Sequence, residues 1–449
     1  MPKTSAKPDE ARVQQLEKER DELQRELGQL RRQVQEQEAA LAVERQLVVD
    51  ILAEVKGGVS EVVSRCEATA ARPRAQIQGF TDDLDDEPTN VTKVEDGDNL
   101  AELPSQLSSW PEYSVWRVPW RRRLQTVCTL FCTWTTPLLL SFCFVLWVIY
   151  VREVWAITFV VVYVGWMFMF DDETPRNGRP WWLIRAMRNL PVIWKACAGY
   201  YPLQLVKTAD LDPSNNFMFC LHPHGFFSLS HAINFATNGT NFMGIFPGVK
   251  CLMLTLRSQF KIPFHREYLL NLGVLEVSRE ALQNTLTRGP GWSVALVPGG
   301  AQEALDAKPG TMKLTLLKRK GFVKIALRNG SSLVPVLAFG ENELYAPLEG
   351  IQSSPLIRAW RWFFKKFYGL ASPAVMGRGV FSKTHPDPFM LPFRKPVTTV
   401  VGAPLAVPRL PEPTGKDIDY WHTQYLESLR ALWERSAPVY APGVKLEIV

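Results

Sequence analysis

Cysteine and histidine are scarce in this sequence, and the cysteine spacing excludes two common structural roles. The 449 residues include seven cysteines and six histidines. The cysteines are scattered, odd in number and never spaced as a zinc-binding pair. They lie at Cys66, Cys128, Cys132, Cys143, Cys197, Cys220 and Cys251. We therefore expect reduced thiols, and neither a disulfide framework nor a structural zinc site.

Acidic residues are outnumbered over most of the chain. Residues 1–108 contain 14 Lys and Arg against 23 Asp and Glu, whereas the remaining residues contain 37 against 22. A basic region of this kind attracts membrane surfaces, anionic substrates or nucleic acid. The long uncharged runs described below favour a membrane, so we expect no nucleic-acid partner.

The first hundred residues are predicted to lie outside the folded domain. After a disordered tail over residues 1–10, apolar residues occupy ten of the thirteen heptad a and d positions from Val13 to Val55. This pattern predicts a coiled coil over residues 11–56 and self-association into a homo-oligomer, because a lone solvated helix would expose its leucine stripe. Residues 57–108 are acidic and aperiodic, which predicts a disordered linker.

The next segment changes to tryptophan, tyrosine and arginine, and then to long uncharged runs. Residues 109–123 have the composition of a segment in the headgroup layer of a membrane. Leu124–Val151 and Val154–Phe170 contain no charged residue, which predicts a transmembrane hairpin over 124–170. A single span followed by a re-entrant segment is the alternative. Arginines flanking both ends predict that both ends are cytosolic.

From residue 171 to residue 449, short apolar strands alternate with helical stretches, which predicts an α/β domain. The expected strands are Phe217–Leu221, Val294–Val297, Leu333–Ala338 and Thr398–Val401. The expected helices include Phe226–Phe235, Lys318–Arg328 and Ile418–Arg435. The chain therefore combines an α/β domain with a membrane anchor and an N-terminal coiled coil.

Two histidines directly follow the first of these strands. His222 and His224 are separated by a proline and followed by Gly225. Histidine exchanges a proton near neutral pH, which suits transfer of an acyl group onto an alcohol. A purely structural role and a His-x-His metal site are the alternatives, although no nearby spacing supplies a third ligand. The aspartate that often lies four residues after such a histidine is replaced by Phe226 and Ser228.

Further stretches contain groups that suit substrate binding. Gly299 and Gly300 follow the strand that begins at Val294, so their amides are candidates for an oxyanion site, and Glu303 is a candidate carboxylate partner for the histidines. A plain turn is the alternative for the two glycines. Arg266 and Glu267 are candidates for substrate contact or for a structural ion pair.

Several basic residues near the expected helix at 318–328 are candidates for binding the phosphates of coenzyme A. They are Lys313, Arg319, Lys320 and Lys324. A solvated or membrane-facing helix explains the same pattern. His231, His385 and His422 lie outside these stretches, and we expect them to be structural.

These motifs together resemble the type-2 diacylglycerol acyltransferase and monoacylglycerol acyltransferase family of endoplasmic-reticulum enzymes. The resemblance covers residues 118–449 and includes the order and spacing of its motifs. Those motifs are Tyr200–Pro202, Leu205–Thr208, His222–Gly225, Pro263–Tyr268, Gly299–Glu303, Arg319–Leu327 and Phe339–Asn342. Two features depart from the family pattern: the coiled coil, and Phe226 and Phe227 where a small aliphatic residue is usual.

The resemblance implies transfer of a fatty acyl group from acyl-CoA to a hydroxyl of diacylglycerol, giving triacylglycerol at the endoplasmic-reticulum membrane and at lipid droplets. Carried over, His224 is the general base, His222 supports it and Glu303 orients the pair. No metal or redox cofactor is implied, and acyl-CoA is a co-substrate. A 2-monoacylglycerol acceptor is the alternative within the enzyme class, and an inactive membrane scaffold is the alternative outside it.

Overall fold

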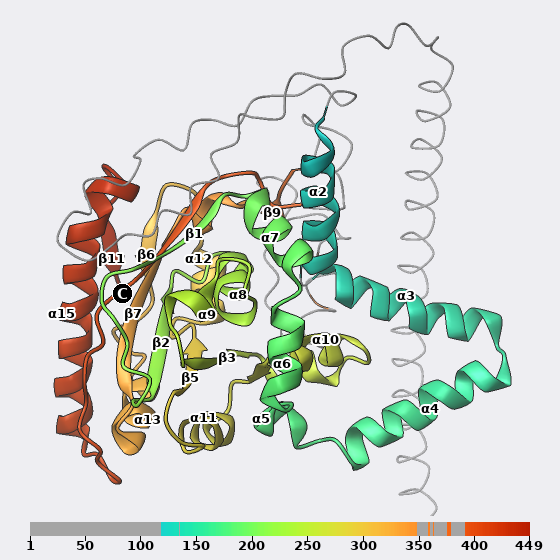
Figure 1. The fold of residues 1–449 in the computed structure, drawn as a ribbon, viewed down its shortest axis with the longest axis horizontal. Coiled ribbons are helices and arrows are strands. Elements are labelled where there is room, and N and C mark those ends of the chain that lie inside the picture. Colours follow the sequence, from blue (N-terminus) through green and yellow to red (C-terminus); the bar gives the residue numbers. More distant parts are fainter. Residues whose placement is uncertain (1–117, 134, 348–357, 360–361, 363–374, 379–390) are drawn as a thin grey trace, which may run out of the picture. The chain divides into compact units, whose positions relative to one another are not determined.

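A seven-stranded mixed β-sheet forms the centre of the structure, which is a computed structural model (Figure 1). It describes residues 118–133, 135–347, 358–359, 362, 375–378 and 391–449. The predicted tail, coiled coil and linker lie outside the described residues, as does most of the predicted interfacial segment. Those predictions therefore stay untested, and the fold below is that of the α/β region.

The strands of the main sheet run in the order β1-β10-β7-β2-β5-β3-β4. Their bounds are β1 Leu203–Lys207, β2 Phe217–His222, β3 Lys250–Thr255, β4 Val274–Glu276, β5 Trp292–Leu296, β7 Ser332–Phe339 and β10 Val397–Val401. β10 is antiparallel to β7, and the other neighbouring pairs are parallel. Two small sheets pair β6 Met312–Leu314 with β11 Leu446–Ile448, and β8 Ala346–Pro347 with β9 Val375–Met376.

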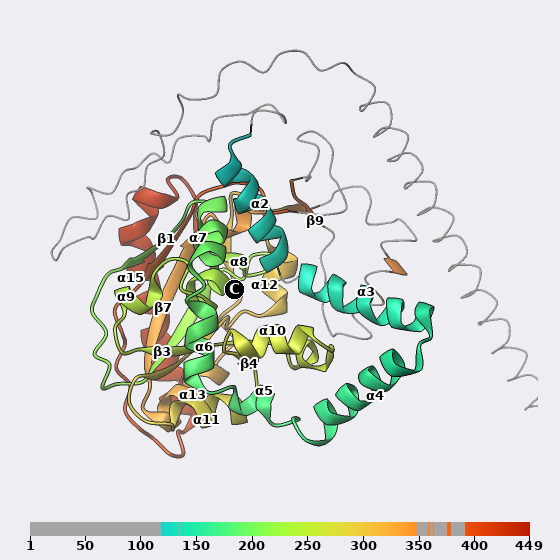
Figure 2. The same ribbon diagram turned by 45° about the vertical axis from the view of Figure 1, so that its right-hand side comes forward.

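Helices cover both faces of this sheet, and the two views show α15 on one side and α6 to α8 on the other (Figures 1 and 2). The helices before β3 are α2 Trp120–Cys132, α3 Thr135–Val151, α4 Val154–Met169, α5 Thr174–Asn177, α6 Trp181–Arg188, α7 Pro191–Tyr200, α8 Leu229–Ala236 and α9 Phe242–Ile245. The later ones are η2 Arg257–Lys261, α10 His265–Asn271, α11 Arg279–Leu286, α12 Ala301–Asp306, α13 Gly321–Asn329, η3 Glu341–Glu343 and α15 Gly415–Tyr440. The α/β class is confirmed.

The four predicted strands are present as β2, β5, β7 and β10, with ends within two residues of the prediction. Each lies in the interior of the sheet with a strand on both sides, and because helices cover both faces of the sheet (Figure 1) a continuous apolar run is favoured over alternation. All six residues of β2 are buried. The central position of β2 is therefore the reason that its sequence is so uniformly apolar.

The predicted helices are also present, with shifted ends. α8 begins at Leu229, three residues after the predicted start, because Phe226 and its neighbours form a turn. α13 ends at Asn329, one residue after the predicted end, and is followed by Gly330, whose φ of +66° is the left-handed cap conformation that glycine favours. α15 begins three residues before the predicted start because Thr414, its N-cap, forms a reciprocal capping box with Asp417, and it continues to Tyr440.

The expected first membrane span, Leu124–Val151, is not one helix. α2 ends at Cys132 with Thr133 in an extended conformation, and α3 begins at Thr135. Proline is tolerated in the first turn of a helix, and Pro137 lies in the first turn of α3. α2 packs against α7 of the α/β region, so the first half of the predicted span belongs to the folded domain.

One arginine fastens α2 to the domain. Arg394, which precedes β10, donates to the carbonyl oxygen of Arg122 at 3.1 Å and to the side chain of Gln125 at 2.8 Å. It also donates to Thr126 Oγ1 at 3.1 Å, and its guanidinium lies 4.0 Å from the centre of the Tyr200 ring. These polar contacts are the physical reason that α2 leaves the predicted hairpin.

The two remaining helices of the predicted hairpin are α3 and α4, joined at Arg152 and Glu153. They contain 17 and 16 residues. Within the described residues, no helix has both the length and the apolarity needed to cross a membrane. The prediction of a two-span hairpin is thus not supported.

We predict that Arg394→Gln loosens α2 from the domain, because the neutral amide cannot replace a guanidinium that bonds to several groups of α2. The expected loss is about 1.5–3 kcal/mol of unfolding free energy, the range for hydrogen bonds to charged groups. Denaturant unfolding of the purified protein measures it. The control is Lys395→Gln, at the exposed neighbouring position. Equal stability of the two variants would contradict this anchoring role.

Candidate active site

Three parallel strands at the middle of the sheet end at the same edge. β2 lies between β7 and β5, and each is followed by one of the motifs singled out in the sequence. The first residue of His222–Gly225 is the last residue of β2, and the first residue of Phe339–Asn342 is the last residue of β7. Gly299–Glu303 comes shortly after the end of β5. In open α/β sheets, ligands bind outside the carboxyl ends of the strands. This edge is therefore the candidate active site.

The imidazole of His224 is held so that one nitrogen remains available. His224 Nδ1 lies 2.9 Å from the carbonyl oxygen of Gly225, and a carbonyl only accepts, so Nδ1 carries the proton. Nε2 then carries the lone pair of the neutral ring. Burial lowers the pKa of His224 from its usual 6.5, which keeps the ring neutral at physiological pH. The half-buried side chain has the properties of a general base.

Glu303 holds the backbone of the histidine loop. Its Oε2 accepts from the backbone N–H of His224 at 3.0 Å, and its Oε1 accepts from the backbone N–H of Thr315 at 2.9 Å. The predicted pairing of His224 with Glu303 is thus present as a contact to the main chain of His224. Glu303 is 2% exposed, and burial raises its pKa to about 7 although both N–H groups and the nearby charge of Arg319 lower it.

Of the two glycines before Glu303, Gly299 makes room for its carboxylate and Gly300 forms a turn. A Cβ on Gly299 would lie 2.0 Å from the Glu303 carboxyl carbon, and Gly300 has a φ of +63°. The Gly300 N–H donates to the carbonyl oxygen of Val297 at 3.2 Å, so this amide is engaged in a turn. The oxyanion role remains a prediction for the Gly299 amide, and the turn named as the alternative is present.

A second buried carboxylate, Glu341, supports the start of α8. Its two oxygens accept from the backbone N–H groups of Leu229 at 2.9 Å and Ser230 at 3.1 Å. A Cβ on Gly225, whose φ is +60°, would lie 2.5 Å from Glu341 Cγ. Burial raises the pKa of Glu341 to about 7. The glycine of the histidine motif therefore allows the close approach of this carboxylate.

Two further side chains, at or just before the start of α8, donate hydrogen bonds to the backbone of the histidine loop. His231 Nε2 donates to the carbonyl oxygen of Pro223 at 2.8 Å, and Ser228 Oγ donates to the carbonyl oxygen of His224 at 2.9 Å. Burial lowers the pKa of His231 to about 4, so this ring is neutral. His231 has the structural role expected of it, and His422 likewise donates to the carbonyl oxygen of Leu316 at 3.1 Å. His385 lies outside the described residues.

His222 does not share the surroundings of His224. It has no exposed surface, and its Nε2 lies 2.8 Å from the hydroxyl of Tyr425 on α15. Its Nδ1 has no hydrogen-bond partner in the described part of the chain. Burial lowers the pKa of His222 to about 3, so this ring is neutral, and with no exposed surface it cannot reach a substrate hydroxyl in this structure. The supporting role predicted for His222 fits a residue that joins the loop to α15.

The two phenylalanines after the motif pack inward. Phe226 and Phe227 form edge-on contacts with Tyr345, with ring centres 6.4 Å and 5.0 Å apart. Tyr345 is 3% exposed. Their departure from the usual small residue is therefore matched by an aromatic cluster beneath the loop.

Arg266 and Glu267 make all their described contacts elsewhere. Arg266 is 1% exposed and donates to the carboxylate of Asp171 at 2.9 Å and to its carbonyl oxygen at 2.8 Å. Glu267 accepts from Tyr163 of α4 at 3.0 Å and from Arg179 at 2.8 Å. The structural ion pairing named as the alternative is present and joins α10 to the segment that follows α4, while the Tyr163 hydrogen bond joins α10 to α4 itself.

The basic residues predicted to bind coenzyme A are divided among several environments. Arg319 is exposed, and its charge acts on Glu303. Lys320 forms an ion pair with Asp419 of α15 at 2.6 Å. Lys313 lies on β6 and Lys324 on α13, both partly buried. Arg319 is thus the member of this group that the structure brings to the site.

Comparison with known proteins identifies the family. Residues 147–448 match the family model described as diacylglycerol acyltransferase. Diacylglycerol O-acyltransferase 2A of Umbelopsis ramanniana is 41% identical over 335 residues, 74% of this chain and 91% of that protein. The chain belongs to the diacylglycerol acyltransferase family. Diacylglycerol O-acyltransferase 2 of Homo sapiens is 40% identical to this family member over 299 residues, 65% of this chain and 73% of that protein.

The resemblance predicted from the motifs is therefore confirmed for this diacylglycerol acyltransferase family member. The crystal structure of the 1-acyl-sn-glycerophosphate (LPA) acyltransferase PlsC from Thermotoga maritima aligns with 71% of this chain and 98% of that chain, at 14% identity and a TM-score of 0.33. A score this low does not establish a shared fold, and the family membership rests on the sequence relatives.

Glu341 and Tyr425 are the site residues that sequence reasoning did not single out. Glu341 lies in a motif quoted for the resemblance, so its position after β7 was a usable signal. Tyr425 lies 203 residues from His222 in the sequence, and only the docking of α15 brings them together. No local pattern in the sequence indicates that contact.

We predict that Tyr425→Phe lowers stability more than it lowers turnover. The change leaves the buried His222 ring without its hydrogen bond, which costs about 1–3 kcal/mol of unfolding free energy. The turnover number should stay within about tenfold of the wild type, since the phenol lies in the core. The control is Tyr420→Phe, because the Tyr420 side chain on the same helix is 59% exposed. Unchanged stability with a large loss of turnover would place His222 in the chemistry.

We predict that Glu303→Gln reduces turnover about a hundredfold, the scale expected when a catalytic group is displaced by about 1 Å. The glutamine amide keeps one oxygen that can accept from the backbone N–H of His224 or of Thr315, but its NH₂ group then faces the other N–H donor. The KM for acyl-CoA should change little, because Glu303 positions the loop. Steady-state kinetics against Asp306→Asn, which removes a carboxylate from the same helix, measures this. Equal kinetics in the two variants would show that Glu303 does not position His224.

Proposed function

We propose that this protein transfers a fatty acyl group from acyl-CoA to the free hydroxyl of diacylglycerol. The observation that carries the proposal is the His224 imidazole, oriented at the edge of the sheet with Nδ1 bonded to Gly225 and Nε2 left as the acceptor. Membership of the diacylglycerol acyltransferase family supports the substrate class.

The reaction follows from this geometry. Nε2 of His224 takes the hydroxyl proton of diacylglycerol while the hydroxyl oxygen attacks the thioester carbonyl carbon. The carbon–oxygen ester bond forms, the carbon–sulfur bond breaks, and the coenzyme A thiolate takes the proton from the imidazolium. The oxidation state of every atom is unchanged, so the step balances with acyl-CoA as co-substrate and no redox cofactor. The Gly299 amide is the candidate donor to the developing oxyanion.

The acceptor and the acylated product are lipids, whereas coenzyme A is water-soluble, so we propose that the protein works at the endoplasmic-reticulum membrane with the site on the cytosolic side. Exposed aromatic side chains of α3 and α4 support contact with lipid. They are Trp147, Tyr150, Trp155, Phe159, Trp166, Phe168 and Phe170. Aromatic residues of this kind favour the membrane interface. Lipid droplets and self-association through residues 11–56 belong to the same proposal.

The function is tested by radiolabelled acyl transfer in microsomes from cells that lack their own neutral-lipid acyltransferases. Oleoyl-CoA is supplied with diacylglycerol, 2-monoacylglycerol or a long-chain alcohol. We predict labelled triacylglycerol from diacylglycerol, falling about 10²–10⁴-fold in His224→Ala, the usual contribution of a general base. If the label appeared chiefly in diacylglycerol made from 2-monoacylglycerol, then monoacylglycerol would be the acceptor instead of diacylglycerol. No label with any acceptor, at normal expression, would support the inactive scaffold.

The proposed base also predicts a pH dependence. His224 must be neutral to accept a proton, and burial lowers its pKa below 6.5, so the wild type should keep its activity at more acidic pH than an ordinary histidine allows. The value of kcat/KM should rise with pH and level off, with a midpoint below 6.5. A midpoint at or above 6.5 that persists in Glu303→Gln would contradict this assignment.

A further inference from the structure

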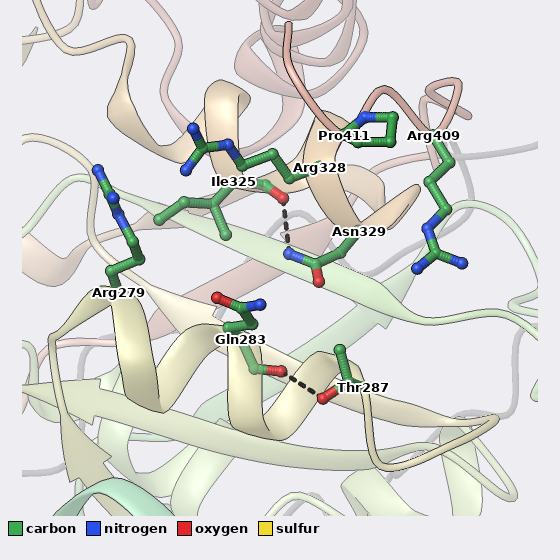
Figure 3. Close-up of a pocket in the computed structure, with 8 residues that line it drawn as sticks. All are labelled: Arg279, Gln283, Thr287, Ile325, Arg328, Asn329, Arg409 and Pro411. Atoms are coloured by element: carbon green, nitrogen blue, oxygen red, sulfur yellow. Dashed lines mark hydrogen bonds between the residues drawn. The ribbon is translucent and has the colours of Figure 1, made fainter.

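A cavity of about 310 Å³ lies between α11, α13 and the segment that precedes α15 (Figure 3). Three arginines line it: Arg279 from α11, Arg328 from α13, and Arg409. Gln283 and Asn329 also line the cavity, and their amide groups lie between Arg409 on one side and Arg279 on the other in the view of Figure 3. The size is at the lower end of the range for small-molecule sites.

The positive charge of the arginines in this cavity is not offset by a carboxylate among its lining residues. No aspartate or glutamate lines it, and within the described residues none of the three arginines forms an ion pair. Nε of Arg328 is buried and has no hydrogen-bond partner in the described part of the chain. Arg279 and Arg409 are exposed, whereas the buried Nε of Arg328 lacks an acceptor, which costs free energy that an anion bound here would recover.

The walls of the cavity are held in place independently of any ligand. The backbone N–H of Leu410 donates to the carbonyl oxygen of Leu327 at 2.7 Å, which fixes the segment with Arg409 to the end of α13. Gly330 allows this approach, because a Cβ there would lie 3.0 Å from Arg409 Cβ. The side chain of Asn329 donates to the carbonyl oxygen of Ile325 at 2.9 Å. The arginines are thus presented from a rigid frame.

The cavity is separate from the candidate active site. Arg328 and Asn329 immediately precede β7, whereas Glu341 and the histidine loop follow the carboxyl ends of β7 and β2. The eight residues of β7 span about 25 Å. None of the lining residues belongs to the segments that surround His224. A ligand here does not occupy the place of the acyl-transfer chemistry.

We propose that this cavity binds a phosphate-bearing anion through Arg279, Arg328 and Arg409. Guanidinium groups match the geometry of phosphate oxygens and form two hydrogen bonds to one group, and the amide of Gln283 adds a neutral donor. The same chemistry is supplied by a soluble phosphate compound or by the headgroup of an anionic phospholipid such as phosphatidic acid. This binding site is separate from the acyl-transfer site, and its ligand is additional to the two substrates of acyl transfer.

The test is a direct binding measurement on the full-length protein purified in a neutral detergent. Inorganic pyrophosphate is the soluble probe, followed by isothermal titration calorimetry. Phosphatidylcholine vesicles with or without phosphatidic acid are the lipid probe, followed by flotation. The variants are Arg328→Gln and Arg409→Gln, and the matched control is Arg435→Gln, an exposed arginine on α15. Diacylglycerol acyl transfer of each variant checks folding and is expected to be unchanged.

We expect saturable binding of one probe to the wild type and to Arg435→Gln, with at least about tenfold weaker binding in the two cavity variants, because each removes a charge-assisted hydrogen bond. Binding of pyrophosphate identifies a soluble ligand, and binding only of phosphatidic acid vesicles identifies a headgroup. Equal affinity in all four proteins, or no binding of either probe, would overturn the proposal. A raised KM for oleoyl-CoA in either active cavity variant would also overturn it as a separate site.

Discussion

The Glu303 carboxylate is the interaction on which the candidate site depends. One of its oxygens accepts from the backbone of His224 and the other from the backbone of Thr315, so it joins the loop after β2 to the segment after β6. Because the contact is to the main chain, it fixes the position of His224 without consuming either ring nitrogen. Gly299 is needed at its side, since any Cβ would collide with the carboxyl group. The first glycine of the second motif is therefore required by the carboxylate.

The strand order makes this arrangement possible. β7, β2 and β5 are parallel neighbours, so the segments that follow them meet at one edge. Glu303 and Glu341 then approach the histidine loop from its two sides, one at the His224 N–H and the other at the start of α8. Both are buried, and burial raises the pKa of each to about 7. The loop is thus supported by two carboxylates whose charge is costly, and the backbone N–H donors offset part of that cost.

Local sequence patterns predicted the parts of this structure that depend on local causes. The uniform apolarity of β2, the glycine cap of α13 and the motifs at the strand ends were all readable, because each follows from backbone conformation or burial on both faces. The pairing of His222 with Tyr425 and the capture of α2 by Arg394 were not, because they join segments 203 and 269–272 residues apart. Hydropathy alone read Leu124–Val151 as one span, since it ignores the polar contacts that Gln125 and Thr126 make with Arg394.

The central claim is that His224 is the base and His222 is a buried support, and chemical rescue with imidazole tests it most directly. Imidazole is added to His224→Ala and, separately, to His222→Ala, while diacylglycerol acylation is measured. Rescue of His224→Ala alone is predicted, because its side chain is half-buried at the edge of the sheet whereas His222 has no exposed surface. Rescue of His222→Ala, with none for His224→Ala, would contradict the assignment.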